Sequence, residues 1–342
     1  MKAKIKPRIN LEDRTPLEKI IPLSTPMILF VDPASICNFK CKFCPTGNPE
    51  LIKNSGRWQG LMDFDLYKKI IDDLGDFEEP LKVLRLYKEG EPFLNKQLAD
   101  MIRYAKKSGM VQYIDTTTNG SRLQPEQIKP ILDAGLDRIN ISVDGMSDEQ
   151  FLEFTGVKVH FDQYVENIAH LYEIKGDCEI CIKITGDFMT REEKENFYTV
   201  FGNYADRIFI ENIAPCWPEF GVEERLGVTI SKGIYNQPIA EVMTCPYIFY
   251  SVAVNADGTV SLCFLDWAHK LLLGNLREQS LKEIWQGEKL FQHQIAHLCR
   301  KRKGNSVCAQ CGQLSHGRPD NIDPYVDILT KRLLATRQSR AE

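Results

Sequence analysis

The sequence contains no long uninterrupted hydrophobic run. A membrane-spanning helix needs about 20 consecutive apolar residues, and no stretch of the 342-residue chain approaches that length. The charged start, MKAKIKPRINLEDRTPLEKI, also lacks the apolar segment of a secretory signal. We therefore expect a cytoplasmic protein that has no membrane partner.

A strong charge of one sign is also missing. The net charge is -4 and the isoelectric point is near 6.0, whereas nucleic-acid-binding domains usually carry a basic patch. Nucleic acid is therefore not an expected partner. The one basic run, Arg300 to Lys303, is short, and we expect it to form a solvated loop. Internal repeats and low-complexity segments are lacking too, which excludes a repeat architecture.

Short apolar runs alternate with amphipathic stretches along the first two thirds of the chain. The pattern predicts strands at 27–35, 81–92, 111–120, 138–145, 178–186 and 207–217, with helices between them. Strands that alternate with helices form parallel sheets. We predict an α/β protein with a partial (β/α)6 TIM-like barrel, in which chemistry takes place at the carboxyl ends of the strands. A doubly wound α/β sheet is the alternative.

The pattern changes after about residue 230. Residues 250–263 alternate around Asn255-Ala256-Asp257-Gly258, which predicts a β-hairpin, and residues 280–298 predict a helix. We therefore divide the chain into an N-terminal arm (1–27), the partial barrel (28–230) and a small α+β cysteine-rich domain with a C-terminal tail (231–342).

Eleven cysteines are unusual for a cytoplasmic chain, where disulfides are disfavoured and clustered thiols indicate metal binding or catalysis. Cys37, Cys41 and Cys44 lie in one short loop, and the next cysteine along the chain is Cys178. A structural zinc site needs four ligands, so a zinc site here lacks one. A [4Fe-4S] cluster held by three thiolates keeps one iron open for another ligand.

The spacing CxxxCxxC, with an aromatic residue before the last cysteine, resembles the signature of the radical S-adenosylmethionine (radical SAM) enzymes. Its position after the first predicted barrel strand matches the partial (β/α)6 barrel of that family. The resemblance covers about residues 28–215. It implies that the open iron binds the amino and carboxylate groups of S-adenosylmethionine (SAM), whose reductive cleavage yields a 5′-deoxyadenosyl radical that takes hydrogen from a substrate.

Other motifs of the family follow in order. KEGEP resembles its Gly-Gly-Glu-Pro motif, with Glu89 in place of the first glycine, and Glu91 would hold the methionyl ammonium group. TTNG and ISVDG lie where the ribose and carboxylate contacts usually occur, although ordinary turn residues at strand ends would give the same pattern. The resemblance therefore implies the following SAM-binding residues: Glu89, Gly90, Glu91, Thr118, Asn119, Ser142 and Asp144.

The C-terminal cysteines form a second set. Four thiolates from three segments can enclose an auxiliary [4Fe-4S] cluster with no open iron, with zinc as the alternative. The arrangement resembles the SPASM domain of radical SAM enzymes, or its shortened twitch form, which implies one auxiliary cluster. The expected ligands are Cys245, Cys263, Cys308 and Cys311, with Cys299 as a spare or outside candidate.

The single auxiliary cluster guides the expected reaction. The short form resembles an aminocyclitol dehydrogenase, in which the cluster takes an electron from the substrate radical. We therefore expect oxidation of a small sugar- or cyclitol-like substrate, with electrons from an external reductant of the flavodoxin or ferredoxin type. A peptide- or protein-modifying SPASM enzyme is an alternative, although about 27 residues ahead of the barrel leave no room for a leader-binding domain. A non-catalytic iron–sulfur scaffold or electron carrier is another.

Cys216 supports a further alternative. It follows the last predicted barrel strand, in ENIAPCWPEF, so its thiol could face the pocket. Related epimerases use such a cysteine to return a hydrogen atom to the substrate radical. A small buried side chain beside Trp217 would explain the residue equally well.

Overall fold

The computed structural model describes residues 1–341, which form one continuous ten-stranded sheet in the order β1-β7-β6-β5-β4-β3-β2-β8-β9-β10. All neighbours from β1 to β8 are parallel. The strands are β1 (Lys4–Ile5), β2 (Ile28–Val31), β3 (Leu81–Leu86), β4 (Val111–Thr118), β5 (Arg138–Val143), β6 (Glu179–Thr185), β7 (Arg207–Glu211), β8 (Ser251–Val254), β9 (Thr259–Ser261) and β10 (Leu272–Asn275).

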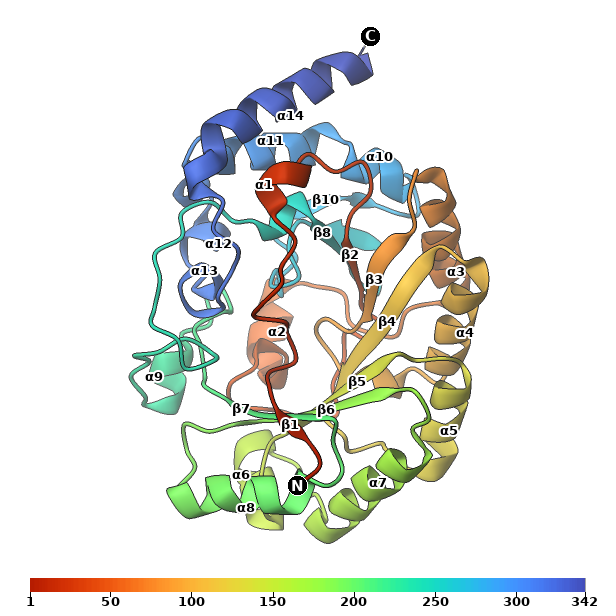
Figure 1. The fold of residues 1–342 in the computed structure, drawn as a ribbon, viewed down its shortest axis with the longest axis vertical. Helices are drawn as coiled ribbons and strands as arrows, with labels where there is room; N and C mark the ends of the chain where they lie inside the picture. The colour runs from red at the N-terminus through yellow and green to blue at the C-terminus, as the bar shows by residue number, and fades with distance from the viewer. Residues whose placement is uncertain (342) are drawn as a thin grey trace.

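The six strands from β2 to β7 lie in chain order and form the barrel part of the sheet. A doubly wound sheet reverses its strand order at a switch point, and this order has no reversal, so the prediction of a partial barrel is confirmed. Figure 1 shows helices covering its outer side. The helices up to residue 226 are α1 (Leu17–Ile20), α2 (Pro49–Ser55), α3 (Phe64–Asp72), α4 (Leu98–Ser108), α5 (Pro125–Asp133), α6 (Asp148–Thr155), α7 (Phe161–Ile174), α8 (Arg191–Phe201) and α9 (Val222–Leu226).

The C-terminal part extends the same sheet. Strand β8 pairs with β2 in parallel, and β8 and β9 form the predicted hairpin, in which Gly258 has a φ of 94°. The prediction of a single helix at 280–298 is wrong, because the helix is interrupted at Gly287 and forms two separate helices. The helices of this part are α10 (Leu281–Trp285), α11 (Glu288–Leu298), α12 (Ser306–Ala309), α13 (Gln313–His316) and α14 (Val326–Ala341).

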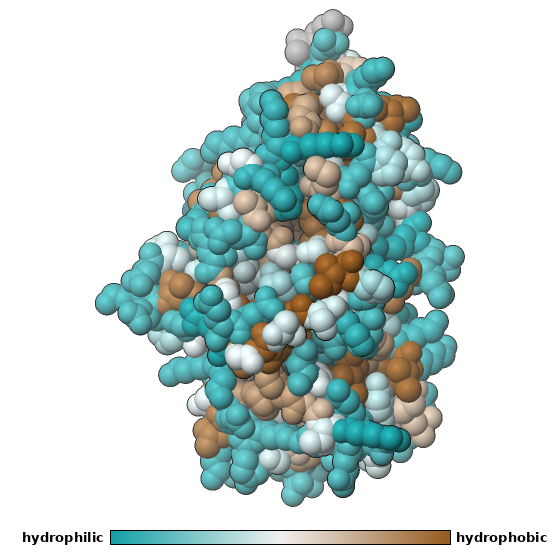
Figure 2. Space-filling model, turned by 90° about the vertical axis from the view of Figure 1, so that its left-hand side faces the viewer, coloured by the Kyte–Doolittle hydropathy of each residue, from teal (hydrophilic) through white to brown (hydrophobic). Residues whose placement is uncertain are grey.

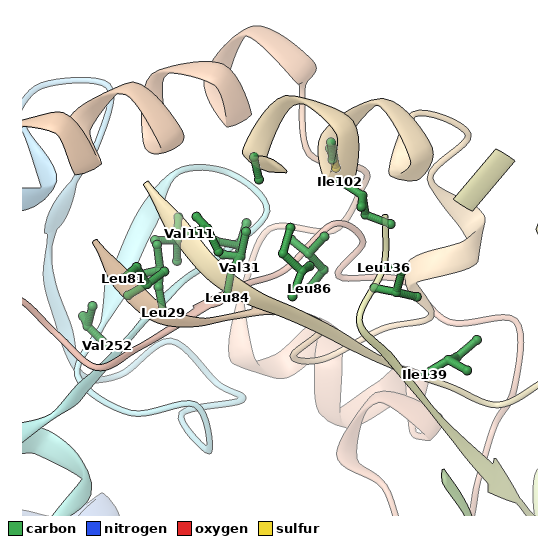
Figure 3. Close-up of a cluster of buried hydrophobic side chains, with 14 of the residues drawn as sticks. Leu29, Val31, Leu81, Leu84, Leu86, Ile102, Val111, Leu136, Ile139 and Val252 are labelled. Atoms are coloured by element: carbon green, nitrogen blue, oxygen red, sulfur yellow. The ribbon is translucent and has the colours of Figure 1, made fainter. Parts of the chain in front are cut away.

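The hydrophobic core lies between the sheet and its outer helices. Alternate strand residues such as Leu84, Ile114 and Ile139 point outward and are completely buried. Figure 3 shows Leu84 and Ile139 among the buried leucine, isoleucine and valine side chains below Ile102 of α4. This packing holds the strands in register and therefore places their carboxyl ends at one edge.

The inward face of the barrel is polar. The inward positions of β3 to β7 include Arg85, Asp115, Asn140, Lys183 and Glu211, and all five strands leave inward side chains partly exposed. TIM barrels usually fill this space with branched apolar side chains. The contrast indicates an interior that is arranged for a ligand rather than for packing.

The N-terminal arm is part of the barrel. Strand β1 pairs with β7, and Figure 1 shows the arm running from there across the front of the sheet to α1. Arg14 of the arm pairs with Asp320 at 3.2 Å and donates to the carbonyl of Arg318 at 2.9 Å. The arm therefore joins the β7 edge of the barrel to the C-terminal part of the chain.

The surface is mainly hydrophilic on the face in Figure 2, where hydrophobic residues form small separate patches. Within residues 1–341, no helix is long and apolar enough to cross a membrane.

Replacing Ile139 by alanine is a test of the core. Ile139 is 0 % exposed in the middle of the barrel sheet, so Ile139→Ala should lower the free energy of unfolding by about 2–5 kcal/mol. Urea titration followed by circular dichroism measures this change. Leu152→Ala is the matched control, because Leu152 is 53 % exposed and should change stability by less than about 0.5 kcal/mol. Equal effects of the two substitutions would contradict the assigned core.

Candidate functional site

The three-cysteine loop follows β2 at the carboxyl edge of the sheet. Its turn is tight, because the Cys44 amide donates to the Cys41 carbonyl at 3.1 Å and the Gly47 amide donates to the Cys44 carbonyl at 3.0 Å. A Cβ atom at Gly47 would lie 2.4 Å from the Cys41 carbonyl oxygen. Only glycine therefore allows the chain to fold back against the loop at this point.

The loop after β3 packs directly on the cysteine loop. The Glu91 amide donates to the Ile36 carbonyl at 3.0 Å, and a Cβ atom at Gly90 would lie 2.1 Å from the carbonyl oxygens of both Ala34 and Ile36. The glycine in KEGEP is thus required by this close backbone contact. The contact holds the three thiols and the Glu91 carboxyl group in one arrangement.

Glu91 is 2 % exposed, and its carboxylate accepts three hydrogen bonds. Thr118 donates at 2.7 Å and the Asn119 amide at 2.8 Å, both from the end of β4. Burial raises the pKa of Glu91 to about 7, and these hydrogen bonds oppose the rise. The structure thus brings together three of the predicted SAM-binding residues.

Asn119 connects this group to the cysteine loop. Its side-chain amide lies 3.9 Å from the Cys37 sulfur and donates to the Asn38 side chain at 3.0 Å. Asp144, which follows β5, lies on the other side, with its carboxylate 3.8 Å from the Cys41 sulfur. Burial raises the pKa of Asp144 to about 6. Ser142 occupies an inward position near the end of β5.

The Glu89 side chain is bound to other protein groups. Its carboxylate lies 2.6 Å from Arg57 and 2.9 Å from His269, and it also pairs with the adjacent Lys88. Burial by itself raises the pKa of Glu89, but the charge of Lys88, the hydrogen bond with His269 and the charge of Arg57 lower it to about 2. Asp32 lies beside it. Burial is the main cause that raises the pKa of Asp32 to about 8, and the negative charge of Glu89 is the second. The role of Glu89 in binding SAM stays a prediction.

The donor set of the cysteine loop fits a cluster bound by three thiolates. Burial raises the pKa of Cys37 to about 12, and it also raises the pKa values of Cys41 and Cys44. After burial, the charge of Cys44 also contributes to the first two shifts. Metal binding supplies the positive charge that keeps buried thiols deprotonated.

The tertiary structure also assembles the four C-terminal cysteines. They come from the segment before β8, the loop after β9, α12 and the turn after α12, and all are free of disulfides. Burial raises the pKa of Cys245 to about 12, and the charges of Cys311 and Cys308 raise it further. The pKa of Cys263 is raised by burial and by the other three thiols. Four converging buried thiols fit an auxiliary cluster.

No three His, Cys, Asp or Glu side chains in residues 1–341 converge closely enough to hold a single metal ion. Cys299 is exposed at the end of α11, unlike the four auxiliary cysteines. Arg302 is 9 % exposed and donates to the carbonyls of Cys308 and Met243. The expectation of a solvated loop is therefore wrong for Arg302, because its guanidinium group holds the auxiliary cysteine segment in place.

Cys216 lies between the barrel interior and the auxiliary cysteines. The Cys311 sulfur is 3.8 Å from the Cys216 carbonyl oxygen. Burial raises the pKa of the Cys216 thiol, as do the charges of Cys311 and Glu211, whereas Arg8 and Lys183 lower it. The thiol is therefore within the electrostatic reach of both regions.

Sequence reasoning missed two groups of residues that the structure brings to this site. The alternating polar residues in the strand sequences LRLY, YIDTT and IKIT are the local signal of this polar inward face. Arg57 and His269 gave no local signal. They reach Glu89 from segments distant in sequence, and only the folded chain brings them together.

Two family models match the chain, and together they cover more than half of it. The model of the radical SAM superfamily matches residues 31–199. The model of the SPASM iron–sulfur cluster-binding domain matches residues 245–312. The two matches contain all seven cysteines that were predicted to bind the clusters.

Curated relatives include two proteins that align along most of their length. A tungsten-containing aldehyde ferredoxin oxidoreductase cofactor-modifying protein from Pyrococcus furiosus is 26% identical over 76% of this chain and 81% of its own. The AdoMet-dependent heme synthase of Methanosarcina barkeri is 22% identical over 80% of this chain and 88% of its own.

Solved structures support the fold. BtrN in complex with AdoMet and 2-DOIA has a TM-score of 0.55 and 20% identity, covering 87% of this chain and 97% of that one. Native anSMEcpe with bound AdoMet has a TM-score of 0.57 and 17% identity, covering 92% and 98%. These findings and the two domain matches lead to one conclusion: the chain belongs to the radical SAM enzymes with a SPASM domain, which bind a [4Fe-4S] cluster with SAM and an auxiliary iron–sulfur centre.

Proposed function

We propose that the protein is a radical SAM dehydrogenase that oxidises an alcohol of a small, polar sugar- or cyclitol-like substrate. Cys37, Cys41 and Cys44 would hold the SAM-binding cluster. Cys245, Cys263, Cys308 and Cys311 would hold one auxiliary cluster. When bound, these cofactors supply the hydrogen-abstracting radical and an acceptor for the electron left on the substrate.

One observation carries this proposal: the auxiliary cysteines lie against the polar barrel interior. Cys311 contacts the backbone of Cys216. Phe264, which follows Cys263, stacks on the inward-pointing Phe30 of β2 with ring centroids 4.6 Å apart. A substrate in the barrel would therefore lie between the SAM-binding loop and an electron acceptor, as oxidation requires. The complex of BtrN with 2-DOIA supports the substrate class only by analogy.

The residues of the chain itself would orient the substrate and take its hydroxyl proton. Glu211 is a suitable acceptor, because it is inward-pointing, 7 % exposed and close enough to Cys216 to shift its pKa. Lys183 lies 2.7 Å from the Glu211 carboxylate and holds it in place through this ion pair. An external one-electron reductant of the flavodoxin or ferredoxin type would supply electrons from outside the chain.

Epimerisation is the second candidate, and the position of Cys216 favours it. Hydrogen-atom donation requires a protonated thiol. Burial raises the pKa of Cys216, which keeps the thiol protonated at neutral pH. In this reaction the thiol would return a hydrogen atom to the substrate radical, and no electron would leave for the auxiliary centre.

Iron analysis tests the two ligand sets. Because each [4Fe-4S] cluster contains four irons, anaerobically reconstituted protein should contain about eight irons per chain. The double variant Cys245→Ser/Cys308→Ser should retain about four and still cleave SAM, whereas Cys41→Ser should cleave none. Cys299→Ser is the matched control and should keep about eight. Full iron content in the double variant would rule out the auxiliary ligands.

Replacing Cys216 distinguishes the two reactions. Cys216→Ala should form 5′-deoxyadenosine at the wild-type level, because the thiol takes no part in SAM cleavage. When a substrate is turned over, a dehydrogenase should give a product with two hydrogen atoms fewer than the substrate. It should consume one SAM molecule for each product molecule. Mass spectrometry in deuterated water measures both reactions.

The opposite result would be that wild-type protein forms an unoxidised product containing solvent deuterium and that Cys216→Ala forms no such product. That result would replace dehydrogenation by epimerisation. Cys178→Ala is a suitable control, because Cys178 is another thiol removed from solvent but lies in the hydrophobic core, just before β6 begins.

A further inference from the structure

The barrel interior carries more positive than negative charge, although the whole chain has a net charge of -4. The strands contribute inward-pointing cations and anions in alternating positions, and the N-terminal arm contributes Arg8. The cations are Arg8, Arg85, Arg138, Lys183 and Arg207, and the anions are Asp115, Glu179 and Glu211. Five cations against three anions leave an excess of two positive charges.

Part of this charge is already paired. Glu179 lies between Arg138 and Arg207 at 2.5 and 2.6 Å, at the amino ends of their strands. Near the carboxyl ends, Lys183 pairs with Glu211 at 2.7 Å. One of the two excess positive charges belongs to the Glu179 group, in which two arginines share one carboxylate. The other lies between these two levels, around Arg8, Arg85 and Asp115.

Arg8 and Arg85 converge on one phenol group. Each donates through Nη1 to the Tyr87 hydroxyl oxygen, at 3.0 Å and 2.7 Å respectively. Their positive charges oppose each other, since Arg8 lowers the pKa of Arg85. Arg138 holds the arm in this position by donating to the Arg8 carbonyl at 3.0 Å. Two guanidinium groups thus share a neutral acceptor, although a carboxylate would balance them better.

The Nε atoms of both arginines lack hydrogen-bond partners. Nε of Arg8 and Nε of Arg85 are buried without a partner in the described part of the chain. The Arg8 guanidinium group also contacts the Tyr235 phenol. The nearest carboxylate oxygen to Arg85 Nε belongs to Asp115 at 4.0 Å, too far for a hydrogen bond. Asp115 is 2 % exposed, and its Oδ1 is also buried without a partner.

Buried unsatisfied donors are costly, and native proteins rarely keep them without a ligand or a function. The Nε–Nη2 edge of arginine matches the two oxygens of a carboxylate or phosphate group. We infer that Arg8 and Arg85 form a recognition site for an anionic group on the substrate, with the N-terminal arm as one wall of the substrate pocket. The unpaired Asp115 oxygen would accept a hydrogen bond from a substrate hydroxyl group.

This inference rests on the proposed function only in placing the substrate inside the barrel. It narrows the substrate class to a polyol or sugar-like molecule that carries a carboxylate or a phosphate. It also assigns a binding role to the arm.

Equilibrium dialysis with radiolabelled inorganic phosphate and radiolabelled acetate tests this site without turnover. Reconstituted protein with bound SAM should bind at least one of the two anions saturably, at one site per chain. The anion that binds more tightly identifies the substrate group as a phosphate or a carboxylate. Arg8→Gln and Arg85→Gln should each weaken this binding by roughly tenfold to a hundredfold, because each removes a charge-assisted hydrogen-bonding group.

Lys6→Gln is the matched control. Lys6 lies in the same arm, two residues before Arg8, and carries the same charge, but it is exposed, so its loss should leave anion binding unchanged. Iron content shows whether each variant has folded. Arg8→Lys, which keeps the charge but loses the bidentate edge, should bind more weakly than wild type.

Two results would overturn the inference: no saturable binding of either anion by the wild type, or equal binding by the wild type and a folded Arg8→Gln variant. Neither result bears on SAM cleavage or on the oxidation of the substrate, which are measured separately. Failure of the anion site and failure of the dehydrogenase proposal are therefore distinguishable.

Discussion

Strand β2 is hydrogen-bonded on both sides to parallel strands, and the arrangement of the two iron–sulfur regions depends on this pairing. Its last residue, Val31, is level with Leu86 of β3 and with Val254 of β8. The cysteine loop begins a few residues later, so it leaves the sheet at the same edge as the loop that follows β3. The auxiliary hairpin is attached to the same strand. Parallel pairing thus places two regions that are far apart in sequence beside one substrate space.

The polar interior of the barrel has an energetic cost, because buried charges need partners. Most of the inward-pointing charges have them, in the Glu179 group at one end and the Lys183–Glu211 pair at the other. Around Arg8 and Arg85 the pairing is incomplete. Incomplete satisfaction is expected where a ligand supplies the missing contacts.

Glu89 has a different role in the same site. It stands where the resembling family motif has glycine, and its carboxylate holds Arg57 from the segment after α2 and His269 from the C-terminal part. Arg57 also donates to the Trp267 carbonyl at 3.0 Å. Its positive charge opposes the rise that burial causes in the pKa of Cys44. The substitution in the motif therefore supports a buried ionic contact between the SAM-binding loop and the C-terminal part of the chain.

Local features of the sequence were enough to predict the elements whose cause is local. The cysteine spacing predicted the radical SAM family, and hydrophobic periodicity predicted the order of strands and helices. The break at Gly287 was missed because helical periodicity continues across it.

Contacts between segments far apart in the sequence could not be predicted. The pairing of β8 with β2, the entry of Arg8 into the barrel and the Arg57–Glu89–His269 contacts each join distant segments. Spacing and periodicity describe only neighbours along the chain, so the sequence by itself determined the three-cysteine loop that carries the family signature. The tertiary structure decided which charges face the barrel interior, because burial and pairing depend on segments that meet only after folding.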